Sequence, residues 1–245
     1  MLALTDHDDV AGLPEAGAAA REAGITLVPG AELSVSWQAL TIHVVALGID
    51  AGDEAFAAGL ASIREGRLGR ARRIGESLAA AGIPGACEGA MRYVTSERLI
   101  SRTHFARFLV EAGHAREVKD VFRRFLSPGK PGYVEHRWST LAQAIGWIHG
   151  AGGLAVLAHP GRYKVDGERG MKALLGDFSD AGGDAIEVLS SSHSPAQAAR
   201  FATLARFHGF AASAGSDYHG PGEAWLDLGD LPPLPAGVEP VWARW

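Results

Sequence analysis

The feature that most constrains the fold is a repeated pattern in which a short apolar run contains, or ends at, a histidine or a carboxylate. Each run has the length of a buried strand, and the six runs span residues 1–5, 26–32, 41–47, 154–158, 185–188 and 210–214. Helices are expected between several of these runs, at residues 13–23, 141–151, 170–181 and 195–207. Strands that alternate with helices predict an α/β domain with a parallel sheet, open or closed.

One long stretch interrupts this alternation. Residues 53–131 are rich in Arg, Ala and Glu, and they contain helix-like segments at 53–82, 102–113 and 115–126. We therefore predict an all-helical insertion at 53–131 that separates two parts of the α/β domain, residues 1–52 and 132–245.

The composition is typical of a globular enzyme of 245 residues, with 47% hydrophobic and 21% charged residues. A formal net charge of −5 gives no basic excess that would favour wrapping of nucleic acid. Cys87 is the single cysteine, which favours a reducing, cytoplasmic location. We see no secretory leader, and no run approaches the roughly 20 apolar residues of a membrane span. No pattern indicates a stable protein partner.

The strand ends carry a set of possible metal ligands. In parallel α/β folds, ligands gather at the carboxyl ends of the strands. The candidates are His7, Glu32, His43, His159 and the pair Asp217 and His219. Each of them alone could be an ordinary structural residue, whereas together they would converge on one site. Asp8 and Asp9 are more typical of solvated or helix-capping positions.

The mixture of imidazoles and carboxylates suits Mn, Fe, Zn or Mg better than a thiolate-bound structural zinc. A carboxylate such as Glu32 could bridge two cations. Paired metals lower the pKa of a bridging water and stabilise both oxygens in a phosphoryl displacement. The set of ligands therefore predicts a metal-dependent hydrolase.

A second group of residues is suited to binding phosphate. Arg102 and His104 open a predicted helix, where backbone N–H groups also favour an anion. Lys130 and Tyr133 follow where the insertion rejoins the domain, and Arg162 comes shortly after the candidate ligand His159 and its proline. These five residues are candidates for substrate binding.

Several other features are less specific. A row of arginines is more typical of a solvated helix face, although it could line a path for nucleic acid; it comprises Arg64, Arg67, Arg70, Arg72 and Arg73. His193 could lie near the site without being a ligand. The glycine-rich stretches contain neither a P-loop nor a dinucleotide-binding fingerprint, which argues against a nucleotide cofactor.

Ordered motifs along nearly the whole chain resemble those of the PHP (polymerase and histidinol phosphatase) superfamily. They are Leu-Thr-Asp-His-Asp at 4–8, Pro-Gly-Ala-Glu at 29–32, His43, Ala-His-Pro-Gly at 158–161 and Gly-Ser-Asp-Tyr-His-Gly at 215–220. Ser-Arg-Thr-His-Phe-Ala at 101–106 and Gly-Tyr-Val at 132–134 resemble the branch that contains nucleoside 3',5'-bisphosphate phosphatases and the 5'-to-3' exoribonuclease RNase AM.

The resemblance implies a distorted (β/α)7 barrel that holds up to three metal ions, commonly Mn²⁺. It implies that Glu32 bridges two metals, that His43 and His159 complete one of them, and that Asp217 binds the other. The implied substrates are phosphate esters of nucleotides or the 5' ends of short RNA.

The resemblance also assigns the remaining residues. His7 and His219 would bind a third metal, and Asp6 would orient or polarise nearby groups. Arg102 and His104 would hold a substrate phosphate. The implied catalytic set is therefore Asp6, His7, Arg102 and His104.

The chain departs from the family pattern at its start. The usual first strand, which ends in Asp-Leu-His-x-His-Ser, is not in the sequence, so we expect the first strand of the barrel to be missing and the chain as given to fall short of full activity. One hypothesis is that a GTG valine codon was read as the start at Met1. Upstream in-frame DNA that encodes His-x-His-Ser would support it.

Two alternatives to the enzyme remain. The chain could be a degenerate PHP module that binds a nucleotide or a partner without catalysis. A polymerase-associated PHP domain is disfavoured because no polymerase region follows. The sequence does not choose between nucleoside bisphosphates and RNA.

Overall fold

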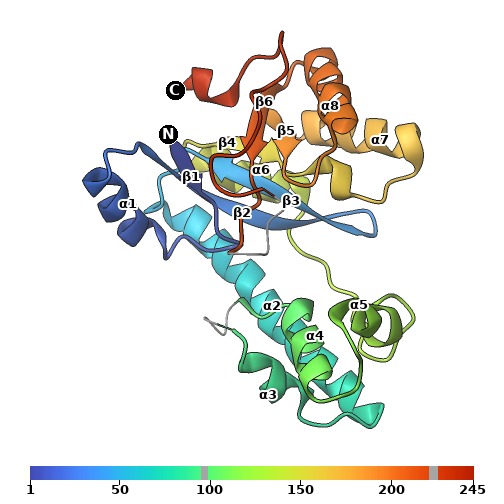
Figure 1. The fold of residues 1–245 in the computed structure, drawn as a ribbon. Helices are drawn as coiled ribbons and strands as arrows, with labels where there is room; N and C mark the ends of the chain where they lie inside the picture. Colours follow the sequence, from blue (N-terminus) through green and yellow to red (C-terminus); the bar gives the residue numbers. More distant parts are fainter. Residues whose placement is uncertain (95–98, 221–225) are drawn as a thin grey trace. The chain divides into compact units, whose positions relative to one another are not determined.

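The computed structural model describes residues 1–94, 99–220 and 226–245, and the chain divides into two compact units (Figure 1). The first unit comprises Met1–Gly59 and Ser139–Trp245, and the second comprises Leu60–Trp138. The long helix α2 (Glu54–Ala80) runs through the boundary between them, so the second unit and the predicted insertion do not begin at the same residue.

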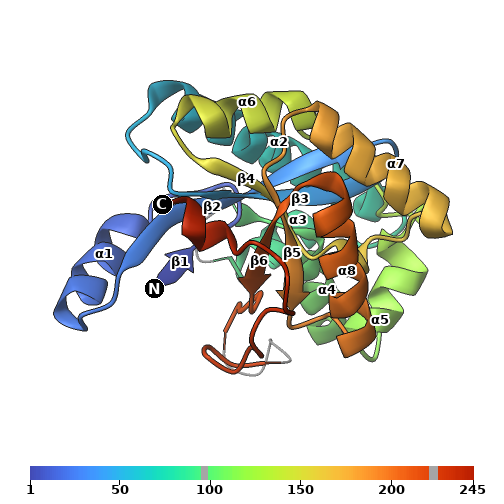
Figure 2. The ribbon, with the colours of Figure 1, turned by 90° about the horizontal axis from the view of Figure 1, so that it is seen from above.

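The first unit is built on a curled sheet of six strands in the order β1-β2-β3-β4-β5-β6 (Figure 2). The strands are β1 (Leu2–Leu4), β2 (Leu27–Trp37), β3 (Leu40–Leu47), β4 (Leu154–Leu157), β5 (Ala185–Ser190) and β6 (Ala211–Gly215). Four helices accompany the sheet, namely α1 (Leu13–Glu22), α6 (Leu141–Gly150), α7 (Gly167–Asp180) and α8 (Pro195–His208). Helix α6 contacts β2, β3 and β4, and α8 contacts β5 and β6. The predicted α/β class is confirmed.

The prediction of a parallel sheet is wrong for two of the strand pairs. Strand β3 runs antiparallel to both β2 and β4, whereas the pairs β1–β2, β4–β5 and β5–β6 are parallel. Only Gln38 and Ala39 connect β2 to β3, and so short a connection can join only antiparallel strands. A parallel crossover needs a dozen or more residues.

Local signals define the ends of helix α8. The Ser194 hydroxyl accepts a hydrogen bond from the backbone N–H of Gln197 (3.2 Å), whose side chain accepts one in return from the Ser194 N–H (2.9 Å). Pro195 occupies the first turn, where its missing N–H costs nothing. Gly209 ends the helix in the left-handed region, at φ 73°. The same capping box opens α6.

The described residues of the second unit form helices joined by turns and irregular segments, without a strand. Beyond its part of α2 it contains α3 (Ala86–Met91), α4 (Arg102–Glu111), α5 (Val118–Val121) and the π-helical turn η2 (Phe122–Leu126). Helix α3 was not predicted. The helices enclose their own core, to which Ile74, Leu78, Phe105, Leu109 and Leu126 belong. No helix in the described ranges is long and apolar enough to cross a membrane.

Gly30 lies in β2 where neighbouring chain segments leave no room for a side chain. A Cβ there would lie 2.5 Å from the Ala46 carbonyl oxygen and 2.9 Å from Cγ2 of Thr5. We expect Gly30→Ala to lower the free energy of unfolding by about 1–3 kcal/mol, the usual cost of overpacking. Urea denaturation measures this change.

Gly146→Ala is the matched control, because Gly146 lies in helix α6 and a Cβ added there would meet nothing within 4 Å. That substitution should be neutral, or stabilising by about 0.5–1 kcal/mol. Equal stability of the two variants would contradict the packing argument.

Candidate metal centre

The β2–β3 hairpin places two of the predicted ligands on one face of the sheet. His43 pairs directly with Ser34, and Glu32 pairs with Val45. Because residues two apart on a strand share a face, His43 lies diagonally beside Glu32. Nδ1 of His43 is 2.7 Å from Oε1 of Glu32. Glu32 lies within its strand and not at its end, because β2 continues to Trp37. His43 lies within β3, as expected.

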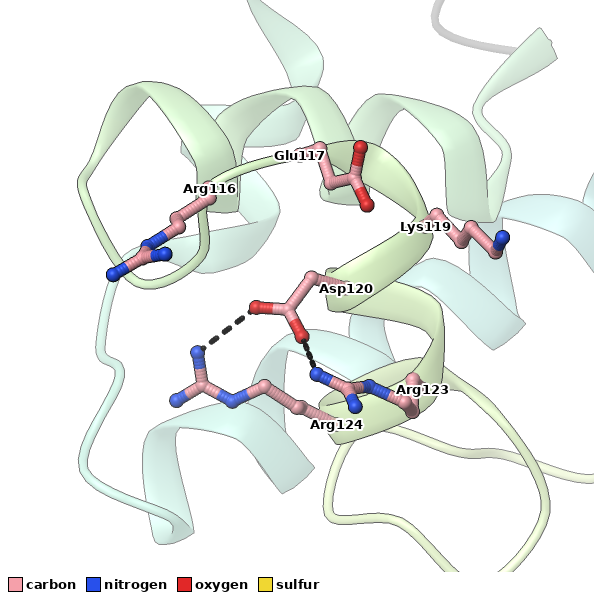
Figure 3. A pocket seen from close by; sticks show the side chains of 6 residues that line it. All are labelled: Arg116, Glu117, Lys119, Asp120, Arg123 and Arg124. Carbon is pink, nitrogen blue, oxygen red and sulfur yellow. Dashed lines mark hydrogen bonds and ion pairs between the residues drawn. The ribbon is translucent and has the colours of Figure 1, made fainter.

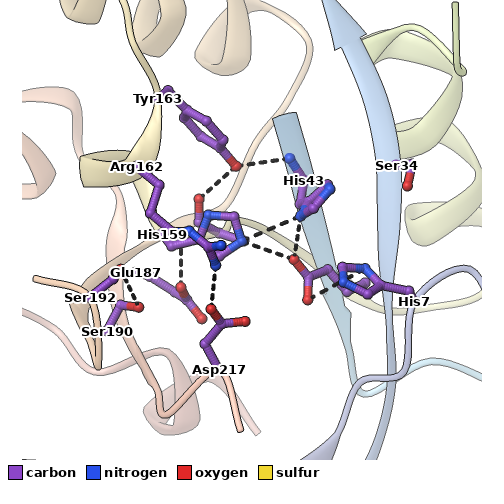
Figure 4. A network of polar contacts seen from close by, with 12 residues as sticks. His7, Ser34, His43, His159, Arg162, Tyr163, Glu187, Ser190, Ser192 and Asp217 are labelled. Atoms are coloured by element: carbon purple, nitrogen blue, oxygen red, sulfur yellow. Dashed lines mark hydrogen bonds and ion pairs between the residues drawn. The ribbon is translucent and has the colours of Figure 1, made fainter. Parts of the chain in front are cut away.

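Two further imidazoles reach the same carboxylate (Figure 4). His159 follows β4, and its Nε2 lies 3.0 Å from Oε1 of Glu32 and 3.4 Å from Nδ1 of His43. His7 forms an isolated parallel bridge with Glu32, which brings its Nδ1 to 3.8 Å from Oε2. Three histidines from distant parts of the chain therefore surround one buried carboxylate.

Asp217 and His219 lie in the loop after β6. Asp217 has a left-handed backbone, at φ 52°, and its carboxylate forms an ion pair with Arg162. A ligand atom of Asp217 lies within 4.8 Å of ligand atoms of both Glu32 and His159. His219 is more exposed, and its Nε2 is 3.5 Å from Nε2 of His7.

The electrostatics of the centre favour a carboxylate in contact with cations. Burial alone would raise the pKa of Glu32, but hydrogen bonds from His159 and His43 hold it well below its usual range. Burial alone would lower the pKa of His159, but the hydrogen bond to Glu32 and the nearby carboxylates raise it instead. The pocket thus stabilises positive charge around an ionised Glu32.

These residues fit a divalent metal ion. Two sets of three residues each offer ligand atoms within 4.8 Å of one another, namely His7, Glu32, His43 and Glu32, His159, Asp217. Nδ1 of His159 is buried and has no hydrogen-bond partner among the described residues. Imidazole nitrogens and carboxylate oxygens are ligands for Mn, Fe and Zn. Four of the predicted metal ligands therefore meet around a fifth, Glu32, and His219 lies beside His7.

Glu187 supports this centre and was absent from the predicted site residues. It is buried in β5, and its Oε2 accepts a hydrogen bond from the backbone N–H of His159 at 2.6 Å. His159 has φ 29°, so this bond holds a strained peptide in place. Burial raises the pKa of Glu187 to about 7. A Cβ on Gly215 would lie 2.3 Å from Oε1 of Glu187, so only glycine fits beside it.

Tyr163 was also missed. Its hydroxyl accepts a hydrogen bond from the backbone N–H of His43 (2.8 Å) and donates one to the carbonyl oxygen of Ala158 (2.9 Å). It therefore ties β3 to the end of β4 beside two of the ligands. The sequence did contain a signal for Glu187, because a carboxylate within an apolar, strand-like run is unusual. No local sequence pattern pointed to Tyr163.

The aspartates near the start of the chain have different environments. The side chain of Asp6 is exposed, and its carbonyl oxygen accepts the Glu32 N–H at 3.0 Å. Asp8, expected to be solvated or capping, is fully buried. Its Oδ1 accepts the Ser34 N–H at 2.6 Å, and its Oδ2 accepts the Ser34 hydroxyl at 3.0 Å. The long-range pairing with β2 explains the wrong expectation for Asp8.

The predicted phosphate-binding residues of the insertion lie in the second unit. Helix α4 begins at Arg102, as expected, and Nδ1 of His104 accepts the Ser101 N–H at 2.9 Å in a capping box. Arg102 is half-buried, whereas Lys130 is exposed. Burial lowers the pKa of Arg102, and the nearby Tyr133 opposes that shift. Their role in substrate binding stays a prediction.

Removal of the central carboxylate tests the centre directly. We expect Glu32→Gln to weaken binding of Mn²⁺ by more than about 100-fold, because it removes the anion that the imidazoles surround; loss of mere supporting groups already costs about 10–100-fold. Isothermal titration calorimetry measures the affinity. Glu15→Gln changes an exposed carboxylate of α1 and should bind as the wild type does. Equal affinities in the two variants would rule out Glu32 as a ligand.

The Tyr163 hydroxyl can be removed without changing the ring. Tyr163→Phe should lower the free energy of unfolding by about 1–3 kcal/mol, because two partly buried backbone groups lose their partner. Metal affinity should fall about 10–100-fold, as for other supporting residues. Thermal denaturation and metal titration measure the two effects. The control is Tyr93→Phe, whose hydroxyl meets the exposed Glu111; the same result for both would contradict the bridging role.

Comparisons with known proteins agree with this geometry. No family model matches the chain. A 3',5'-nucleoside bisphosphate phosphatase from Chromobacterium violaceum is 54% identical over 99% of this chain and 85% of its own length. The 5'-3' exoribonuclease Rnm from Salmonella typhimurium is 47% identical over 100% of this chain and 83% of its own length.

A solved structure from Bifidobacterium adolescentis, described as a metal-dependent phosphoesterase, superposes with a TM-score of 0.77. It is 27% identical and covers 99% of this chain and 82% of its own chain. The chain therefore belongs to the family of metal-dependent phosphoesterases that contains the 3',5'-nucleoside bisphosphate phosphatases and the 5'-3' exoribonucleases.

Proposed function

We propose that this chain hydrolyses phosphate esters of nucleotides, with nucleoside 3',5'-bisphosphates or the 5' ends of short RNA as substrates. The observation that carries the proposal is the buried Glu32 carboxylate, which three imidazoles surround. The names of the two relatives supply the substrate classes. The reaction takes place in the cytoplasm.

The metal ions of this proposal are Mn²⁺, with Fe, Zn and Mg as alternatives. Glu32 would be shared by two of up to three ions, His43 and His159 would hold the first with it, and Asp217 would serve the second. A divalent ion bound there lowers the pKa of water and neutralises charge on the phosphoryl oxygens. The contacts of His43 and His159 with the same oxygen of Glu32 support the first position, and Asp217 offers a ligand atom within 4.8 Å of Glu32 for the second. His7 and His219 serve a third position.

The remaining residues bind and orient the substrate. Arg162 contacts Asp217 and is half exposed, so its guanidinium has donors available for a phosphate oxygen. Asp6 orients groups near His7. Arg102 and His104 hold a phosphate at the start of α4, where backbone N–H groups add to the positive potential. Lys130 and Tyr133 complete the substrate-binding set.

The proposed fold is a distorted (β/α)7 barrel of the PHP type to which the six-stranded sheet belongs, with an insertion at residues 53–131. The order of the strands and the TM-score of 0.77 to a metal-dependent phosphoesterase support a barrel of this type.

A steady-state assay tests the function. With Mn²⁺ present, the protein should release phosphate from a nucleoside 3',5'-bisphosphate, and a chelator should abolish the activity. We expect His43→Ala to lower kcat/KM by at least about 100-fold, the scale expected when a metal ligand is lost. His114→Ala, in the second unit, should act as the wild type does.

Metal binding without hydrolysis of either the bisphosphate or a 5'-phosphorylated RNA would overturn the proposal. That outcome would favour the alternative of a module that binds nucleotides without catalysis.

A further inference from the structure

Three arginines form a row along helix α2 within the second unit. Arg67, Arg70 and Arg73 are spaced three residues apart, so they share one side of the helix. At a rise of 1.5 Å per residue the row is about 9 Å long. Arg70 is half-buried and Arg73 is exposed, so the row is not the fully solvated helix face that the sequence favoured.

Two aromatic side chains from the segment after the helices lie against this row. The guanidinium carbons of Arg67 and Arg70 lie 5.1 and 5.7 Å from the ring centroid of Trp138. Nη2 of Arg73 is 3.3 Å from Nδ1 of His136. The rings of His136 and Trp138 meet edge to face at 4.1 Å. We call these five residues the basic–aromatic face.

Backbone contacts hold this face in position. Nε of Arg70 donates a hydrogen bond to the carbonyl oxygen of Val134 at 3.3 Å. A Cβ on Gly66 would lie 2.9 Å from Nε2 of His136, so the glycine allows the imidazole to pack directly on the helix. The face is therefore an ordered arrangement of side chains.

Positive charge accumulates at this face. Burial lowers the pKa of Arg70 to about 10, and repulsion from Arg102, Arg67 and Arg73 adds to the shift. Burial and the same arginines of α2 lower the pKa of His136 to about 4, so its imidazole is neutral at pH 7. A neutral imidazole can accept the hydrogen bond from Arg73.

No carboxylate within the described ranges forms an ion pair with Arg70 or Arg73. The nearest acidic residues in sequence, Glu65, Glu76 and Glu135, are exposed. The potential of these two arginines is therefore available to an anionic ligand.

In another basic region of the same unit, a carboxylate does form ion pairs with arginines. Its depression around α5 is lined by Arg116, Glu117, Lys119, Asp120, Arg123 and Arg124 (Figure 3). There Asp120 forms ion pairs with both Arg123 and Arg124. Its cations are thus partly neutralised by carboxylates of the same depression, and it presents a weaker site for an anion.

We propose that the basic–aromatic face binds a single-stranded RNA through its phosphates and bases. Guanidinium groups bind phosphate oxygens in pairs, and aromatic or guanidinium planes stack on unpaired bases. A row about 9 Å long offers its guanidinium groups to more than one phosphate, and a polynucleotide presents such successive phosphates. The inference rests on the proposed function and selects RNA as its substrate class.

Binding to metal-free protein in the presence of a chelator tests the inference without hydrolysis. Fluorescence anisotropy with 5'-phosphorylated RNA should show that affinity rises from a dinucleotide to an oligomer of about ten nucleotides and falls with salt. Arg73→Gln should weaken binding of the oligomer by roughly tenfold and reduce the slope of log K against log salt by about 1. Arg72→Gln, an exposed neighbour outside the row, should bind as the wild type does.

The inference is overturned if affinity does not depend on RNA length, or if Arg73→Gln and Arg72→Gln bind the oligomer equally well. Circular dichroism of both variants checks that they remain folded. Because the side chain of Arg73 is exposed, we expect its substitution to leave the fold intact. Phosphate release from a nucleoside bisphosphate by the wild type, with Mn²⁺, is measured separately. A failure there counts against the proposed function and leaves the RNA-binding result intact.

Discussion

The structure of the first unit depends on one buried charge, the carboxylate of Glu32. A buried ion costs several kcal/mol unless oppositely charged or hydrogen-bonding groups surround it. His43 and His159 meet this requirement at 2.7 and 3.0 Å, and His7 approaches from the chain before α1. The strands must therefore bring together residues separated by more than a hundred positions. A divalent cation fits the same arrangement because its charge also compensates that of Glu32.

The backbone is shaped to allow this convergence. The β2–β3 hairpin places His43 diagonally beside Glu32, which a parallel pair with a long crossover would not do. Glycine appears where another group approaches too closely for a Cβ, as at Gly215 beside Glu187. Glu187 and Tyr163 then hold the peptides of His159 and His43. Glu187 and Tyr163 thus support the two ligands through hydrogen bonds to the ligands' backbone and not to Glu32.

The two units handle charge in opposite ways. Around Glu32, imidazoles and carboxylates balance one another, whereas Arg70 and Arg73 meet a carbonyl oxygen and a neutral imidazole. The overall net charge of −5 conceals this difference, because it averages a local basic face with acidic residues elsewhere. Local potential rather than total charge decides what an anionic substrate meets.

The sequence by itself located the six strands and most of the helices, although it missed α3 and the full length of β2, and it identified the residues that gather around Glu32. Apolar periodicity and helix caps are local signals, so they located elements such as α1 and α8 to within a few residues. The tertiary structure decided the direction of β3, the burial of Asp8 and the supporting roles of Glu187 and Tyr163. It also decided that Arg70 faces Trp138. These features depend on contacts between segments that are distant in the sequence. Local periodicity reports only on neighbouring residues, so it does not reveal which distant segments meet.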